Sequence, residues 1–228
     1  MAGILYGVGV GPGDPELLTL KAVRIITESD IIIVPGEQAQ DSVAYKIASN
    51  AVDLSVKEVV AVSMPMTKNE NLLERSHQDA ANQVLEYMNQ GKQVAFLTLG
   101  DPTVYSTYVY IHKRILETGA KAVIVSGIPS FCAAAALVND SLVEKSEPLH
   151  IIPASYGIEE ALKLSGTKVL MKAGKKIATV KQILKDNNLQ AVMVENCGME
   201  NEKVYVGTDH INENAGYYSL IIVKDKKL

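Results

Sequence analysis

The chain has 228 residues, 47% of them hydrophobic, and a formal net charge of -4 at pH 7. This length suffices for two compact domains of modest size or one large one. The acidic balance argues weakly against an RNA or DNA substrate, although a local basic patch could still form in the folded chain. With no apolar run of membrane-spanning length and no leader pattern at its start, the sequence predicts a cytoplasmic protein without membrane contact.

Strands and helices alternate along the first half of the chain. The apolar, Gly-dense residues 3–11 predict a strand that runs into a loop. Asp14 has the character of a helix cap, Pro15 suits the first helical position, and apolar residues then recur at helical spacing as far as Ile26. The further elements expected are strands at 30–35, 58–62, 93–99 and 121–126 and helices at 41–51, 69–90 and 103–117. This alternation predicts an α/β domain with a mostly parallel sheet.

The second half has a different rhythm, with strands that follow each other more closely. A short Ala-rich helix is expected at 129–138, and strands at 149–153, 167–171, 191–196, 203–206 and 217–223. The last three strands are not separated by long helices, so antiparallel pairing and a mixed sheet are expected there. We place the domain boundary near Gly127, which gives two α/β domains, residues 1–127 and 128–228, with a ligand cleft expected between them.

Cysteine and histidine usage gives no sign of a disulfide or a metal centre. Cys132 and Cys197 lie far apart in the sequence and are expected to be free thiols. The histidines show no spacing typical of metal ligands, so no metal site is predicted.

The first glycine-rich turn, residues 7–15, invites comparison with dinucleotide-binding loops. That fingerprint needs a third small residue, and Pro12 or Asp14 stands where it would fall, depending on the register chosen. Pro12 also removes an amide donor that a phosphate cradle would use. Two interpretations stay open: glycines that let backbone or a flat ligand approach closely, or a purely structural tight turn.

Two more turns follow predicted strands, where ligands bind in α/β proteins. In Gly100-Asp101-Pro102 the aspartate is either a plain helix cap or a carboxylate that faces a cationic ligand, such as the sulfonium of S-adenosylmethionine. In the turn at 126–131, Ser130 is expected to cap the next helix, at the domain boundary.

The order and spacing of these turns resemble the tetrapyrrole methylase family, the two-domain methyltransferases called class III. The resemblance covers essentially the whole chain and includes residues 7–22, Gly100-Asp101-Pro102 and the turn at 127–130. Within the family, residues 97–108, with support from 129–131 and 169–172, are most similar to the C20-methyltransferases of the corrin pathway.

The resemblance implies that S-adenosylmethionine binds folded between the two domains, largely through backbone groups. Carried onto this chain, the cofactor-binding positions are Leu99, Gly100, Asp101, Val104, Thr107, Ser130, Phe131, Met171, Lys172 and Ser219. It also implies a homodimer and a tetrapyrrole substrate, precorrin-2 or cobalt-factor II, which would itself carry any cobalt. The reaction implied is C20 methylation in cobalamin (vitamin B12) biosynthesis.

Methyl transfer from a sulfonium is a direct displacement, which needs alignment and a dry site and no protein nucleophile. A proton must leave C20 afterwards. Asp101 is the first candidate for orienting the substrate or assisting that step, and Tyr218 is the second. The alternative for Tyr218 is a half-buried strand tyrosine without a chemical role.

Several rival functions stay open at this point. Within the family, methylation at another corrin ring carbon, of ribosomal RNA or of diphthine would use the same fold. A nucleotide-binding oxidoreductase is disfavoured by the incomplete glycine fingerprint. A non-catalytic ligand-binding protein is disfavoured by the intact Gly100-Asp101-Pro102.

Overall fold

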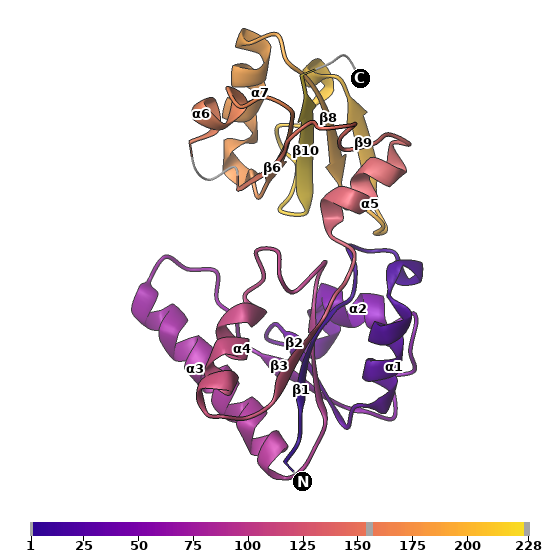
Figure 1. Cartoon of the computed structure of the whole chain (residues 1–228), viewed down its shortest axis with the longest axis vertical. Coiled ribbons are helices and arrows are strands. Elements are labelled where there is room, and N and C mark those ends of the chain that lie inside the picture. The colour runs from indigo at the N-terminus through magenta and orange to yellow at the C-terminus, as the bar shows by residue number, and fades with distance from the viewer. Residues whose placement is uncertain (1, 154–156, 226–228) are drawn as a thin grey trace. The chain divides into compact units, whose positions relative to one another are not determined.

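The computed structural model describes residues 2–153 and 157–225. The chain divides into two compact units, Met1–Pro129 and Ser130–Leu228, and both contain helices packed on a sheet (Figure 1). None of the helices in this described part is long and apolar enough to cross a bilayer.

The sheet of the first unit is parallel and has the strand order β3-β2-β4-β1-β5. Its strands are β1 (Leu5–Gly9), β2 (Ile31–Pro35), β3 (Glu58–Val62), β4 (Val94–Thr98) and β5 (Ala122–Val125). The prediction of a mostly parallel sheet is therefore confirmed for this unit. The central strands β2 and β4 are apolar along most of their length because both faces of a parallel sheet are covered by helices.

The helices of this unit fall on both faces of the sheet. They are α1 (Leu20–Glu28), α2 (Val43–Ser49), α3 (Glu70–Asn89) and α4 (Tyr108–Glu117), with the 3-10 turns η1 (Pro15–Leu17) and η2 (Ala39–Asp41). Figure 1 shows α1 and α2 on one face and α3 and α4 on the other. Right-handed crossovers require this, since the chain moves one way from β1 to β3 and the opposite way from β3 to β5.

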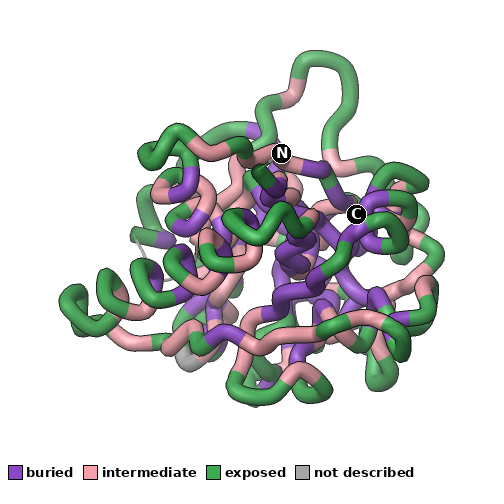
Figure 2. The backbone as a smooth tube through the Cα atoms, turned by 90° about the horizontal axis from the view of Figure 1, so that it is seen from below, coloured by how far each residue is buried: buried purple, intermediate pink, exposed green. Residues whose placement is uncertain are grey.

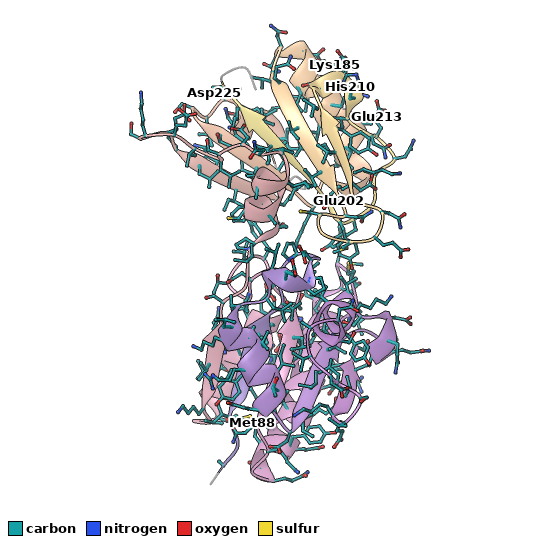
Figure 3. The ribbon with its side chains drawn as sticks, turned by 90° about the vertical axis from the view of Figure 1, so that its right-hand side faces the viewer. Met88, Lys185, Glu202, His210, Glu213 and Asp225 are labelled. Carbon is teal, nitrogen blue, oxygen red and sulfur yellow. The ribbon has the colours of Figure 1, made fainter. Side chains whose placement is uncertain are left out.

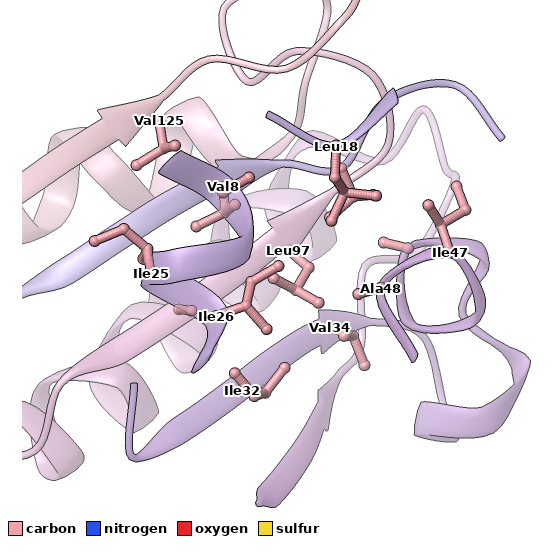
Figure 4. Close-up of a cluster of buried hydrophobic side chains, with 14 of the residues drawn as sticks. Val8, Leu18, Ile25, Ile26, Ile32, Val34, Ile47, Ala48, Leu97 and Val125 are labelled. Carbon is pink, nitrogen blue, oxygen red and sulfur yellow. The ribbon is translucent and has the colours of Figure 1, made fainter. Parts of the chain in front are cut away.

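Side chains alternate between two apolar clusters, one on each face. Ile32 and Val34 of β2 belong to the cluster with α1 and α2, and Ile31 and Ile33 belong to the cluster with α3 and α4. Figure 4 shows the first cluster, which includes Val8, Leu18, Ile25, Ile26, Ile47, Leu97 and Val125. Figure 2 colours the chain by burial: the buried segments lie mostly inside and the exposed turns outside.

One contact in the second cluster depends on a missing side chain. Tyr108 of α4 is 1% exposed and lies directly over Gly7 of β1. A Cβ atom built on Gly7 would lie 2.0 Å from the Tyr108 ring. The Tyr108 hydroxyl lies 3.0 Å from Nδ1 of His112, and burial raises the pKa of this tyrosine.

The first helix begins later than expected. Asp14 accepts a hydrogen bond from the Glu16 amide at 2.8 Å, but it caps only the short turn η1. Leu18 is then extended, with ψ 134°, and ends that turn. Thr19 caps α1, because its hydroxyl accepts a hydrogen bond from the Ala22 amide at 3.1 Å.

The fourth helix also begins later, at Tyr108 and not at residue 103. Asp101 accepts a hydrogen bond from the Thr103 amide at 2.7 Å, which forms a local turn in place of the first helical turn. Tyr105 then adopts φ 49°, a left-handed conformation that cannot continue a helix. Val104 and Thr107 therefore lie in a loop before α4.

The second unit has a mixed sheet in the order β6-β7-β10-β8-β9. Its strands are β6 (Leu149–Pro153), β7 (Thr167–Met171), β8 (Gln190–Glu195), β9 (Lys203–Val206) and β10 (Ser219–Lys224). The predicted antiparallel pairing of the last three strands is confirmed, since β8 pairs antiparallel with both β9 and β10.

The helical elements of this unit are α5 (Ser130–Leu137), α6 (Ile158–Leu162), η3 (Gly174–Lys176), α7 (Ile177–Asp186) and η4 (Thr208–His210). No helix was expected between β7 and β8, where α7 lies. Its buried residues Ile177, Val180 and Leu184 follow helical spacing and pack in the core of the unit. Lys185 of α7 pairs with Asp209 of η4 at 2.7 Å, close to His210 and Glu213 in Figure 3.

An ion pair between a buried lysine and an exposed aspartate holds the end of β10 in this unit. The side chain of Lys168 in β7 is fully buried, and its Nζ donates to the carboxylate of Asp225, which is labelled in Figure 3. The Gly166 amide donates to the other oxygen of Asp225 at 2.6 Å. Burial works to raise the pKa of the Asp225 carboxyl, but the hydrogen bonds from Lys168 and Gly166 outweigh it, so this pKa lies below its ordinary value.

We expect Asp225→Asn to reduce the acid sensitivity of this unit. Because the pKa is lowered in the folded state, the stabilisation is present above the unfolded pKa of about 4 and is lost as the pH falls through the folded value. Urea unfolding between pH 7 and pH 2 checks this, with Asp209→Asn in the exposed Lys185 pair as control. Identical pH profiles for wild type and Asp225→Asn would contradict the expectation.

Candidate functional site

The carboxyl ends of β4, β1 and β5 meet at three glycines. A Cβ atom on Gly9 would lie 2.5 Å from the Gly100 carbonyl oxygen and 2.7 Å from the Gly127 nitrogen. A Cβ atom on Gly127 would lie 2.2 Å from the same Gly100 oxygen. All these neighbours are backbone atoms, so the close approach is available only to glycine.

The loops after β1 and β4 are also hydrogen-bonded to each other. Gly100 donates to the Gly11 carbonyl at 2.8 Å, and Gly11 donates back to the Gly100 carbonyl at 3.3 Å. Both residues have positive φ, 76° for Gly11 and 70° for Gly100. The glycines of the first turn thus serve close backbone approach, one of the two interpretations that the sequence left open.

Asp101 ties this arrangement together. The residue is 7% exposed, and its Oδ1 accepts hydrogen bonds from the amide and the hydroxyl of Thr103, at 2.7 Å and 2.5 Å. Its Oδ2 accepts a hydrogen bond from the Gly127 amide at 2.9 Å. Both carboxylate oxygens therefore hold loops, and the geometry supports a positioning role for Asp101 in place of proton transfer.

The strand order makes this edge of the sheet the expected place for a ligand. β1 and β4 are neighbours, but the chain leaves β1 toward α1 and leaves β4 toward α4, on opposite faces. In open α/β sheets, ligands bind outside the strand ends where the connections diverge in this way. Gly9, Gly11, Gly100 and Asp101 lie at that point.

Five of the residues implied by the resemblance lie on this edge, in the segment from Leu99 to Thr107. Leu99 and Val104 are half-buried, and the Val104 amide donates to the Asp101 carbonyl at 3.2 Å. Thr107 is exposed and immediately precedes α4.

The second unit gathers another group of these residues at one end of its sheet. Met171 at the end of β7 pairs with Leu220 of β10, so Lys172 and Ser219 lie next to this pair. The Tyr218 carbonyl accepts a hydrogen bond from the Asn196 amide at 2.8 Å. Ser130 and Phe131 are in the first turn of α5; the helix starts at Ser130 itself, so the serine is not the residue before it.

The tyrosines before β10 do not supply a base at neutral pH. Tyr218 is 40% exposed, and its ring meets the Tyr217 ring edge-on, with centroids 5.4 Å apart. Burial and the neighbouring Tyr217 raise the pKa of Tyr218. The phenol therefore stays protonated and is suited to donating a hydrogen bond.

Sequence reasoning missed a polar group at the same end of this sheet. Glu195 at the end of β8 accepts hydrogen bonds from the Gly216 amide at 2.9 Å, from the Tyr205 hydroxyl at 3.3 Å and from Asn212 at 3.4 Å. A charged residue directly after the buried run of β8 is a signal that could have indicated it. In the first unit, the Asp-Pro-Thr spacing could have indicated the Asp101–Thr103 turn.

A model of the family described as Tetrapyrrole (Corrin/Porphyrin) Methylases matches residues 4–209 of this chain. The chain belongs to the tetrapyrrole methylase family. The expected family is therefore confirmed, and the glycine-lined edge is the candidate site of a tetrapyrrole methylase.

Individual members of the family match over nearly the full chain. The chain is 37% identical to the probable cobalt-precorrin-2 C(20)-methyltransferase of Methanocaldococcus jannaschii, over 96% of this chain and 95% of that protein. It is 30% identical to the cobalt-precorrin-2 C(20)-methyltransferase of Salmonella typhimurium, over 98% and 97%. Its fold is similar to uroporphyrin-III C-methyltransferase from Thermus thermophilus complexed with S-adenosylhomocysteine, with TM-score 0.70, 20% identity and 98% of each chain covered.

We expect Gly127→Ala to destabilise the first unit of this tetrapyrrole methylase by about 1–3 kcal/mol, because the added methyl group would overlap backbone. Gly216→Ala is the matched control, since Gly216 has no positive φ and a Cβ atom there would meet only Glu195 Oε1, at 3.8 Å. Urea unfolding of both variants measures the difference. Equal midpoints for Gly127→Ala and wild type would show that the loops can separate without penalty.

Replacing Asp101 by Asn tests its positioning role. Whichever way the amide turns, either the Gly127 or the Thr103 donors lose an acceptor, which is expected to cost about 1–3 kcal/mol of stability. Cofactor affinity should fall at least as much as kcat. Asp53→Asn is the control, because Asp53 makes the same type of turn with Ser55 at an exposed site. Lost turnover with unchanged cofactor affinity would instead assign the carboxylate a chemical role.

Proposed function

We propose that this protein transfers a methyl group from S-adenosylmethionine to C20 of precorrin-2 or cobalt-factor II, a step of cobalamin biosynthesis. The observation that carries the proposal is the glycine-lined edge at Gly9, Gly100 and Gly127, in a chain whose family methylates tetrapyrroles. The choice of C20 is supported by the full-length similarity to the proteins of Methanocaldococcus and Salmonella that are named for this reaction.

The residues at this edge fit such a cofactor. Gly9 and Gly127 let the ends of β1, β4 and β5 meet backbone to backbone, because a Cβ atom at either position would overlap the neighbouring loop. Leu99, Gly100 and Asp101 would present backbone groups to the methionine end. By the family resemblance, Met171 and Lys172 of the second unit would contact the adenosine, and Ser130, Phe131 and Ser219 would be further contacts.

When bound, S-adenosylmethionine supplies an electrophilic methyl group on a positively charged sulfur. Transfer to C20 would form the new carbon–carbon bond with an electron pair of C20, would break the carbon–sulfur bond to give a neutral thioether, and would release the C20 proton to bulk solvent afterwards. The protein's contribution is alignment and exclusion of water. Asp101 aligns by holding the loops after β4 and β5, and Tyr218 contributes a hydrogen-bond donor.

The test is incubation of the purified protein with labelled S-adenosylmethionine and either precorrin-2 or cobalt-factor II. The expected product gains one methyl group at C20. A single methyl group mapped to another carbon would support the rival that methylates a different ring position. Absence of label from both tetrapyrroles would overturn the corrin assignment.

A homodimer and a cytoplasmic location belong to the same proposal. The family resemblance supports the homodimer, and the sequence features described above support the cytoplasmic location. The proposed substrate carries many carboxylates. Comparing the methylation of precorrin-2 with that of cobalt-factor II decides whether cobalt is already present when the methyl group is added.

A further inference from the structure

The loop between β4 and α4 contains a residue in an unusual conformation. Tyr105 has φ 49°, and its side chain is 44% exposed. A left-handed backbone conformation is unfavourable for a residue with a bulky side chain. Residues held in such conformations cluster at functional sites. Tyr105 is the one aromatic residue with a positive φ in the part of the chain that the structure describes.

Hydrogen bonds on both sides impose this conformation. Before Tyr105, the Val104 amide donates to the Asp101 carbonyl at 3.2 Å. After it, the Ser106 hydroxyl lies 2.9 Å from the Thr98 hydroxyl and accepts a hydrogen bond from the Tyr108 amide at 3.3 Å. The loop is therefore anchored to β4 and to the start of α4, and Tyr105 lies between the anchors.

Tyr110, a few residues further on, shows the ordinary alternative. It is 50% exposed, has helical backbone in α4, and stacks on His77 with ring centroids 4.8 Å apart. The backbone of Tyr110 is therefore ordinary, whereas the backbone of Tyr105 is strained and calls for an explanation.

We propose that Tyr105 is a substrate-positioning residue whose ring stacks on the flat, conjugated tetrapyrrole. This inference rests on the proposed function, because it takes the substrate class from it. Tyr105 follows β4 at the glycine-lined edge, between Val104 and Thr107, which are proposed cofactor-binding positions. Aromatic rings bind flat conjugated ligands by offset stacking, and a rigid loop lowers the entropy lost on binding.

Three substitutions at Tyr105 separate the effect of its ring from the effect of its strained backbone. Tyr105→Phe keeps the ring, Tyr105→Ala removes it but keeps the strain, and Tyr105→Gly removes both. Binding of cobalt-factor II is measured by absorbance titration, and binding of S-adenosylmethionine by calorimetry. Tyr110→Ala is the matched control for loss of an exposed ring.

We expect the Ala and Gly variants to bind cobalt-factor II about tenfold more weakly or worse, with S-adenosylmethionine affinity unchanged. Tyr105→Phe should bind as wild type does, and Tyr110→Ala should keep its affinity for the tetrapyrrole. The melting temperature of Tyr105→Gly should equal or exceed that of Tyr105→Ala, because glycine relieves the strain.

Unchanged tetrapyrrole affinity in Tyr105→Ala and Tyr105→Gly would overturn the inference while leaving the proposed function intact. Weaker binding of S-adenosylmethionine in place of the tetrapyrrole would overturn it too, and would assign Tyr105 to the cofactor. If the wild-type protein binds cobalt-factor II but does not methylate it, the proposed function fails and the stacking role is still measured. If it binds no tetrapyrrole, both fail.

Discussion

The close approach of three backbone segments at Gly9, Gly100 and Gly127 is the constraint on which the candidate site depends. Separations that leave no room for a Cβ atom bring the ends of β1, β4 and β5 together without side chains between them. The Asp101 carboxylate then supplies acceptors for the loop amides drawn into this space. Because the residue is buried, losing these bonds would leave polar groups unsatisfied, so the loops are held rigidly.

The parallel sheet beneath explains why such loops are tolerated. Strands covered on both faces form a stiff base, and the helices that follow β1 and β4 lie on opposite faces. The edge between them is left to loops, and the left-handed conformations of Gly100 and Tyr105 lie there. An enzyme that works by aligning its substrates benefits from a stable sheet that carries preorganised loops at its edge.

Much of this arrangement is predictable from the sequence, but only where the signal is local. The continuous apolar runs of β2 and β4 predict buried parallel strands because each run must satisfy two faces. The predicted starts of α1 and α4 were wrong. Aspartate is a residue type that often caps helices, but the local turns that Asp14 and Asp101 form end before a helix begins. The bond from Gly127 to Asp101 spans 26 residues, so no local pattern reveals it. The family resemblance supplied residue positions at the site, but not the reason why a buried carboxylate is needed there.

The contact between Gly7 and Tyr108 has a consequence for how the sequence can vary. The tyrosine ring fills the volume that a side chain at position 7 would occupy, so the two positions share one space although they belong to different elements. A larger residue at position 7 is compatible with the fold only if position 108 becomes smaller at the same time. Positions 7 and 108 should therefore covary among relatives. A substitution at only one of them would leave the core either overpacked or with a cavity.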